Sequence, residues 1–180
     1  MVAVNFLSWS AIILTQAELR PYGKILRDLI EEENKDEEEQ SGFRTGRSCT
    51  DNIFCMKQVT EKRNARNQET HLLFVDLTKA CDNIPISKLW KVLGESNVNN
   101  TLIKALQNLY GNTAQVKIGN KLSHHFNITK GLHQGCCISP TLFKIYIQKA
   151  LEEWKRKCSR MGIPLKKKKH CIHFSLQMIK

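Results

Sequence analysis

The chain has 180 residues, enough for one modest domain or for part of a larger one, and its 41% hydrophobic content supports a packed core and excludes wholesale disorder. Its seven cysteines are odd in number and irregular in spacing, which argues against a secreted disulfide framework and favours an intracellular location, in the nucleus or the cytoplasm. No apolar run is long enough for a membrane-spanning helix, so no membrane partner is expected.

Charge is distributed unevenly along the chain. Residues 1–40 contain nine acidic and four basic residues, whereas residues 41–180 contain eight acidic and 24 basic residues. A block that basic attracts polyanions, and nucleic acid is the first candidate. A solvated basic surface without a partner has the same composition, so charge leaves both interpretations open.

Hydrophobic periodicity predicts mainly helices in the first third of the chain. Residues 1–19 are a mildly apolar segment of uncertain role, and a helix is expected over residues 17–33. The acidic run at residues 31–39 is interpreted as a solvated helix end or loop. A turn at residues 41–48 leads to a second helix over residues 51–64, whose apolar positions recur at roughly helical spacing: Ile53, Phe54, Met56 and Val59.

The middle of the chain is expected to begin with a strand. Residues 71–76 contain four consecutive apolar residues followed by an acid, a pattern typical of a short buried strand. Two helices are expected after it, over residues 87–93 and 101–110, from the spacing of their apolar residues.

A hairpin and a long helix are expected in the last third. Gly119-Asn120 suits the turn of a β-hairpin with strands at residues 115–118 and 126–129. Ser139 suits the N-cap of an amphipathic helix, and Pro140 suits its first position, where the missing N–H costs nothing. The order of all these elements predicts the α+β fold class.

The predicted strand at 71–76 carries the first chemical signal. A carboxylate at the end of a buried strand, here Asp76, is held rigidly while its tip reaches solvent. That arrangement suits an ion bound where a phosphate also binds. A single Asp of this kind more often simply ends a strand, so this pattern alone does not define a site.

A second chemical signal is the loop before the long helix. Gly135 permits close approach of the backbone to a ligand, and Gln134 offers a donor and an acceptor beside it. A loop of this type, followed at once by a helix, can lie against a nucleotide or a nucleic-acid strand. Alone, it is equally consistent with an ordinary loop and a well-capped helix.

Three motifs together resemble landmarks of the reverse transcriptases of non-LTR retrotransposons, in the same order and at compatible spacing. Residues 38–48, which include Ser41-Gly-Phe-Arg-Thr-Gly-Arg-Ser48, are similar to a stretch of the fingers. Residues 74–82 are similar to the first catalytic motif of the palm, and residues 131–140 to the Gln-Gly and Ser-Pro motif that follows it. The resemblance implies a partial right-hand polymerase fold, with the fingers and part of the palm, over residues 20–165.

The resemblance also implies an activity and a cofactor. In this family two Mg²⁺ ions organise the attack of a primer 3′-hydroxyl on an incoming deoxynucleotide, and RNA or DNA is copied into DNA. Asp76 matches the catalytic, metal-binding Asp of the motif, and the backbone carbonyl of Leu77 would be a second oxygen ligand. The implied partners are an RNA or DNA template–primer and deoxynucleotides.

A nucleotide- and template-binding surface is implied in the same way. Gln134 and Gly135 match the residues that face the nucleotide and the template, and Arg44 and Arg47 match the fingers motif near phosphates or template backbone. Cys81 occupies a position where the family has Phe or Tyr, which packs beneath the sugar and excludes a 2′-hydroxyl. Because Cys81 is much smaller, we expect discrimination against ribonucleotides to be impaired.

The sequence departs from the family most strongly near its end. No acidic residue follows Glu153, so we expect the third palm motif, an aromatic-Ala-Asp-Asp turn, and the thumb to be absent and this chain alone to be inactive. A frameshift would explain residues 176–179, because TTT GCA GAT GAT CAA encodes Phe-Ala-Asp-Asp-Gln but reads Leu-Gln-Met-Ile from its second base. Residues 166–180 are therefore interpreted as a basic tail that a frameshift has put out of frame.

Two alternatives remain open for the present behaviour of the chain. It is either a non-catalytic basic module that binds nucleic acid, or the unselected product of a decayed element that binds nothing specifically. Salt-dependent binding without primer extension favours the first alternative. A broad, non-cooperative melt favours the second.

Overall fold

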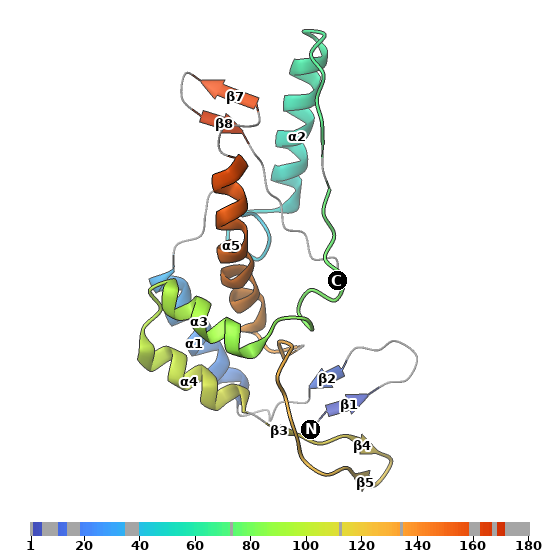
Figure 1. Cartoon of the computed structure of the whole chain (residues 1–180), viewed down its shortest axis with the longest axis vertical. Coiled ribbons are helices and arrows are strands. Elements are labelled where there is room, and N and C mark those ends of the chain that lie inside the picture. Colours follow the sequence, from blue (N-terminus) through green and yellow to red (C-terminus); the bar gives the residue numbers. More distant parts are fainter. Residues whose placement is uncertain are drawn as a thin grey trace. The chain divides into compact units, whose positions relative to one another are not determined.

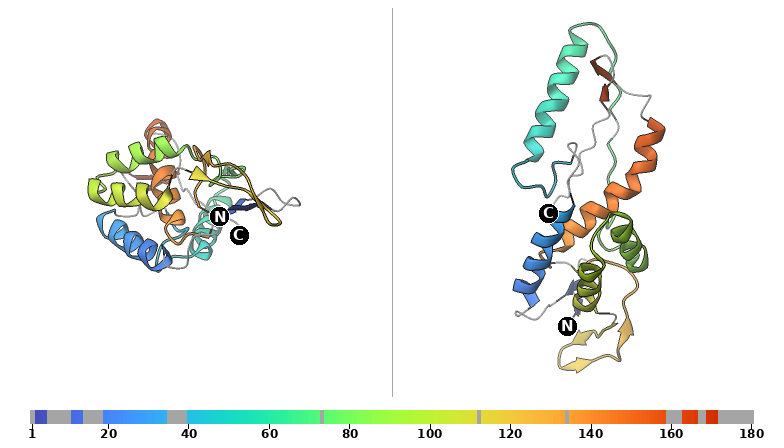
Figure 2. Two further views of the ribbon diagram at one scale, coloured as in Figure 1. Left: turned by 90° about the horizontal axis from the view of Figure 1, so that it is seen from below. Right: turned by 90° about the vertical axis from the view of Figure 1, so that its left-hand side faces the viewer.

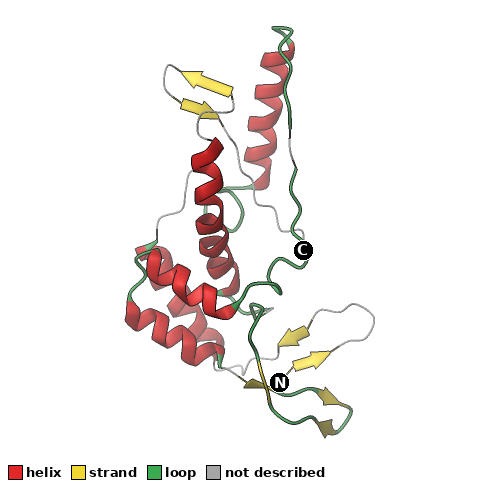
Figure 3. Cartoon of the chain, in the orientation of Figure 1, coloured by secondary structure: helices red, strands yellow, loops and turns green. Residues whose placement is uncertain are grey.

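The computed structural model describes residues 2–4, 11–13, 19–34, 40–72, 74–111, 113–133, 135–158, 163–166 and 169–171. The chain divides into two compact units, each considered by itself: unit 1 comprises residues 1–35 and 79–152, and unit 2 comprises residues 36–78 and 153–180. Helices combine with short antiparallel strand pairs, which confirms the predicted α+β class (Figure 3). Among the described residues, no helix is both long and apolar enough to cross a membrane.

Unit 1 is built on helices that the apolar spacing predicted (Figure 1). They are α1 (Leu19–Glu33), α3 (Ile86–Glu95), α4 (Asn100–Tyr110) and the part of α5 (Ser139–Cys158) up to Glu152. α4 contacts both α1 and α3 (Figures 1 and 2). The buried apolar core of the unit consists of Leu26, Ile30, Ile84, Leu89, Leu93, Val98, Ile103, Leu106, Tyr110, Leu132, Ile138, Leu142, Phe143 and Ile145.

Two acidic side chains of α1 tie this helix to its neighbours. The hydroxyl of Thr141 on α5 donates a 2.8 Å hydrogen bond to Glu31, and the backbone N–H of Asn99 donates a 2.9 Å bond to Glu33. Asn99 is the N-cap of α4, so the Glu33 carboxylate lies at the end of a helix where negative charge is favourable. The start of the acidic run is therefore more than a solvated helix end, and residues 35–39 of that run lie outside the described residues.

The strands of unit 1 form three short antiparallel pairs within the described residues. β1 (Val2–Val4) pairs with β2 (Ala11–Ile13), β3 (Thr113–Ala114) with β6 (Phe126–Asn127), and β4 (Lys117–Ile118) with β5 (Lys121–Leu122). The Gly119-Asn120 turn is confirmed, with Gly119 at a φ of +58°. The predicted strand partners were wrong, because a two-residue turn pairs the residues immediately beside it.

Unit 2 contains α2 (Cys49–Asn64), which confirms the predicted helix. Its buried residue is Asn52, whose side-chain oxygen accepts a 2.9 Å hydrogen bond from the buried Ser41 hydroxyl. Ile53 and Phe54 are 60% and 61% exposed, so the apolar positions of this helix do not form a buried stripe. The unit also contains β7 (Ile163–Lys166) and β8 (Lys169–Cys171), a strand pair that the irregular basic composition did not predict.

The predicted buried strand at 71–76 was wrong. Residues 71–72 and 74–77 are loop, and Phe74 and Val75 are 76% and 70% exposed (Figure 3). A strand depends on a neighbouring segment for its hydrogen bonds. No such neighbour pairs with this stretch within the part of the chain that the structure describes.

Candidate functional site

A short backbone ladder joins two of the motif segments inside unit 1. The N–H groups of Ile86, Gly131 and Leu132 donate hydrogen bonds of 3.1, 2.9 and 3.0 Å to the carbonyls of Thr129, Ile84 and Cys81. Pro85 and Lys130 form the antiparallel bridge between these bonds. The ladder therefore holds Cys81, the residue expected beneath a nucleotide sugar, beside the loop that leads to the Gln-Gly motif.

The close approach of these segments requires a glycine. Gly131 has a φ of +97°, a conformation that strongly favours glycine, and an added Cβ would lie 3.4 Å from the carbonyl oxygen of Asp82. The sequence pattern pointed to Gly135 as the position of close approach and did not single out Gly131. Gly135 also has a positive φ, of +85°, but an added Cβ there meets no atom within 4 Å.

An aromatic cluster packs beside the loop that leads to the Gln-Gly motif. The imidazole of His133 stacks on the ring of Tyr110, with ring centroids 4.2 Å apart and planes inclined by 20°. Trp90 meets the same tyrosine edge-on, with centroids 5.7 Å apart. The Tyr110 and Ser139 hydroxyls share a 3.0 Å hydrogen bond, and Ser139 donates a 2.7 Å bond to the carbonyl of His133. The apolar spacing placed Tyr110 in the helix at 101–110, but nothing in the sequence indicated that its ring would stack on His133.

Ser139 is not the N-cap that the sequence suggested. It is the first residue of α5, and the first intrahelical bond runs from the N–H of Leu142 to the carbonyl of Ile138. Its hydroxyl is instead used in the bonds to Tyr110 and His133. Pro140 accordingly follows one position later than predicted, still within the first turn, where its missing N–H leaves no bond unmade.

Burial shifts the ionisation of several groups around the loop. Burial lowers the pKa of His133 and raises the pKa of Tyr110, so both rings are uncharged near neutral pH. Burial also raises the pKa of Cys81, with a smaller contribution from the neighbouring Asp82 carboxylate. The thiol of Cys81 is therefore protonated and acts as a small, weakly polar surface.

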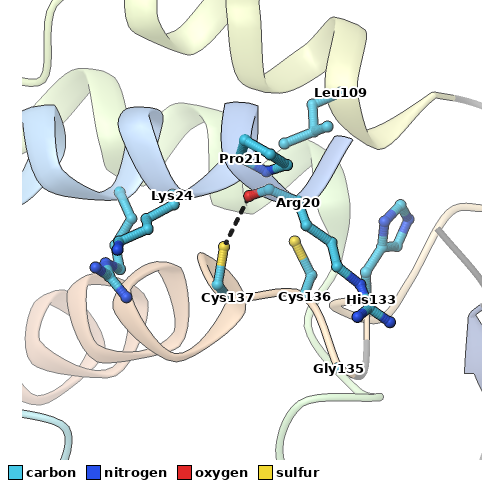
Figure 4. Close-up of a pocket in the computed structure, with 9 residues that line it drawn as sticks. Arg20, Pro21, Lys24, Leu109, His133, Gly135, Cys136 and Cys137 are labelled. Carbon is cyan, nitrogen blue, oxygen red and sulfur yellow. Dashed lines mark hydrogen bonds between the residues drawn. The ribbon is translucent and has the colours of Figure 1, made fainter. Parts of the chain in front are cut away.

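A cavity of about 540 Å³ opens between α1 and the Gln-Gly loop (Figure 4). One side carries the cations of α1, and Figure 4 shows Arg20 reaching toward the loop that holds His133 and Gly135. Its size suits a small molecule such as a nucleotide, and its cations suit anionic groups. The residues that line it are Arg20, Pro21, Lys24, Arg27, Leu109, His133, Gly135, Cys136 and Cys137.

α1 approaches this loop closely at a glycine. A Cβ added to Gly23 would lie 3.3 Å from the sulfur of Cys137, and the Cys137 thiol donates a 3.8 Å hydrogen bond to the carbonyl of Arg20 (Figure 4). Arg27 is partly neutralised by a 2.7 Å ion pair with Asp28. Arg20 and Lys24 are therefore the cations that best suit a bound anion.

Four of the remaining predicted site residues lie in unit 2, and the fifth is Gln134. Asp76 and Leu77 are exposed in the loop before Lys79, while Arg44 is half-buried and Arg47 exposed in the turn before α2. Gln134 lies outside the described residues. The structure thus brings Cys81 and Gly135 into one unit and describes Asp76, Arg44 and Arg47 in the other.

The described residues do not complete a metal site. Exposed carboxylate and carbonyl oxygens, such as those of Asp76 and Leu77, are the ligands that Mg²⁺ prefers. However, no group of three His, Cys, Asp or Glu side chains converges on one metal position in the described part of the chain. One carboxylate and one carbonyl are too few to hold two divalent ions.

The chain is thus an α+β protein with a cation-lined cavity beside a glycine-containing loop. Residues 8–175 match the family described as "Reverse transcriptase (RNA-dependent DNA polymerase)", and the chain belongs to this family. The activity of the family is DNA synthesis on an RNA template, which involves a nucleic-acid template, nucleotides and divalent metal ions.

Proposed function

We propose that this chain contributes the fingers and part of the palm of a reverse transcriptase of the non-LTR retrotransposon kind. Residues 20–165 form the polymerase part, preceded by the segment 1–19 and followed by the basic tail 166–180. The motifs at 38–48, 74–82 and 131–140 support this assignment, as does the family match over residues 8–175.

One observation carries the proposal. The bond from the Leu132 N–H to the Cys81 carbonyl joins the end of the first palm motif to the start of the Gln-Gly motif. A template-directed polymerase needs these two segments together, since both contact the same incoming nucleotide. In this proposal Gln134 and Gly135 face the nucleotide and template, and Cys81 lies beneath the sugar.

The cation-lined cavity supports a binding role for α1. Arg20 and Lys24 of α1 line the cavity together with Gly135. Guanidinium and ammonium groups in such a cavity suit phosphate oxygens, which accept charged hydrogen bonds. Arg44 and Arg47 would add template-backbone contacts from the fingers.

The metal assignment follows from the family. Asp76 and the Leu77 carbonyl bind Mg²⁺ in this proposal, and only four residues separate Asp76 from Cys81. The bound ion would supply charge neutralisation at the phosphate. Without further carboxylates, a polypeptide of this sequence alone binds template without extending a primer, since no Asp or Glu follows Glu153.

Primer extension tests this proposal directly. The purified 180-residue chain is incubated with an RNA template, a DNA primer, deoxynucleotides and either Mg²⁺ or Mn²⁺. We expect no extension, together with binding of the template–primer that weakens steeply as salt is raised. Extension that disappears in an Asp76→Ala variant would contradict the proposed inactivity, and absence of any binding would contradict the nucleic-acid role.

An unselected product of a decayed element is the second candidate. The exposure of Phe74 and Val75 in unit 2 favours it, because large exposed apolar groups promote association and poor folding. A broad, non-cooperative thermal transition would support this candidate, and a sharp one would oppose it. The genomic DNA tests the frameshift separately: codons for residues 176–180 that do not spell Asp-Asp in another frame exclude it.

The location of the chain is part of the same proposal. A polymerase that copies genomic elements works inside the cell, in the nucleus or the cytoplasm. Imaging a tagged chain in cells tests this, and secretion into the medium would contradict it.

A further inference from the structure

A two-stranded β-ribbon follows α4 in unit 1 and precedes the Gln-Gly loop in the sequence, and its strand β4 also contacts β1. It comprises residues 113–127, with the pair β3–β6 at its base and the pair β4–β5 at its tip (Figure 1). Between the two pairs, the Ser123 N–H donates a 2.9 Å bond to the Val116 carbonyl, and the Val116 N–H donates a 2.9 Å bond to the Ser123 hydroxyl. The ribbon is therefore held by its own hydrogen bonds along most of its length.

The tip of the ribbon is exposed and positively charged. Lys117, Ile118, Lys121 and Leu122 are all exposed, with Ile118 at 68% and Leu122 at 55%. No acidic residue occurs anywhere between Glu95 and Glu152 in the sequence. The lysines of the ribbon consequently have no acidic neighbour on their own segment, and a polyanion is the partner of complementary charge.

The register of the tip places one lysine on each face. Lys117 pairs with Leu122, and Ile118 pairs with Lys121. Directly paired residues of antiparallel strands project to the same face, and successive residues project to opposite faces. Each face thus presents one ammonium group and one aliphatic side chain, which would suit a partner that surrounds the ribbon on both sides.

We propose that this ribbon enters the major groove of duplex DNA. The major groove of B-form DNA is about 12 Å wide and admits a two-stranded ribbon, with a phosphate strand on either side. Lys117 and Lys121, which project from opposite faces, would then each meet one phosphate strand, with Leu122 and Ile118 beside them on those same faces. The inference rests on the proposed nucleic-acid-binding function and adds a contact outside the cavity beside α1.

The geometry also predicts a preference among nucleic acids. The major groove of an A-form RNA duplex is deep and narrow, and side chains cannot read it. We therefore expect the ribbon to enter the major groove of duplex DNA and not that of duplex RNA. The ribbon is thus a recognition element for DNA rather than for the RNA template.

Fluorescence anisotropy with labelled 20-base-pair DNA and RNA duplexes tests the proposal on the full chain. The ribbon variant is Lys117→Ala/Lys121→Ala, and the charge-matched control is Lys88→Ala/Lys104→Ala on the exposed surfaces of α3 and α4. Circular dichroism confirms that both variants fold like the parent. We expect the ribbon variant to bind DNA several-fold more weakly than the control, and its slope of log K against log salt to fall in magnitude by about 1.8.

The remaining outcomes separate the inference from the proposed function. Equal losses of DNA affinity in the ribbon variant and the control would overturn the proposed groove contact. An equal loss of affinity for the RNA duplex in the ribbon variant would overturn it too. A concentration-dependent dimer that Ile118→Ser abolishes would show that a second copy covers the ribbon, which also overturns the inference. Absence of all nucleic-acid binding by the parent chain would overturn the proposed function together with it.

Discussion

The backbone N–H of Leu132 donates a hydrogen bond of 3.0 Å to the carbonyl of Cys81. This bond joins segments that are far apart in the sequence and that resemble two different motifs of reverse transcriptases. The next residue, His133, stacks on the ring of Tyr110. A backbone hydrogen bond and a side-chain stack on adjacent residues thus hold this part of the candidate site together.

Substitution of Gly131 should weaken the ladder. Gly131→Ala forces a φ of +97° on a residue with a Cβ, which would lie 3.4 Å from the Asp82 carbonyl. We expect a loss of about 1–3 kcal/mol in the free energy of unfolding, measured by urea denaturation. Gly94→Ala is the matched control: it lies in α3 with no atom near its added Cβ, and it should raise stability by up to about 1 kcal/mol. Equal effects of both substitutions would contradict the strain at Gly131.

Removal of one hydroxyl should loosen the aromatic cluster. Tyr110→Phe keeps the ring stacked on His133 but deletes the 3.0 Å bond to Ser139. We expect a loss of about 1 kcal/mol in unfolding free energy. Unfolding is monitored by the change in fluorescence of Trp90, which contacts the same ring. Tyr22→Phe on the exposed side of α1 should leave stability unchanged, and a similar loss there would argue against a specific role for Tyr110.

Acidification should destabilise unit 1 through His133. Burial lowers the pKa of His133 below its ordinary value of 6.5, so the unfolded chain binds a proton at this residue before the folded chain does. The stability from the neutral ring is complete above pH 6.5 and is lost as the pH falls through the lowered pKa. Denaturation midpoints measured between pH 7.5 and 5 should fall more steeply for the parent than for His133→Phe. Parallel curves would exclude His133 as the source.

Neutralising the wall of the cavity should weaken phosphate binding. Arg20→Ala/Lys24→Ala removes two cations that line the cavity beside Gly135. A hydrogen bond to a charged group contributes roughly 1.5–3 kcal/mol, so we expect affinity for inorganic pyrophosphate to fall at least about tenfold. Isothermal titration calorimetry measures this change. Lys62→Ala/Arg66→Ala, which removes two exposed cations in and just after α2, is the control and should leave the affinity unchanged.

The helices were predictable because their signals are local. The apolar spacing in α4 and α5 is carried by residues three and four positions apart, and the same residues, such as Leu106 and Leu142, are buried in the structure. The predicted strand at 71–76 failed for the opposite reason. Its four apolar residues describe a propensity, but a strand forms only where another segment supplies hydrogen bonds.

The candidate site was predictable only in its motifs. The sequence pointed to Cys81, Gln134 and Gly135 through the family resemblance, and the structure places Cys81 and Gly135 in unit 1. The sequence could not indicate the roles of Tyr110 and Arg20 in the site, because these roles depend on the packing of α4 and α1 against the loop. A glycine that permits close approach, such as Gly23, likewise acquires meaning only once its neighbour Cys137 is known.

The β-ribbon begins just after Tyr110, whose ring is stacked on His133, and ends just before Lys130, which is bridged to Pro85. Each end of the ribbon thus lies only a few residues from a residue that packs beside the Gln-Gly loop. Inserting a peptide between Gly119 and Asn120 would therefore test whether a change at the ribbon tip affects the loop, without altering any residue that lines the cavity.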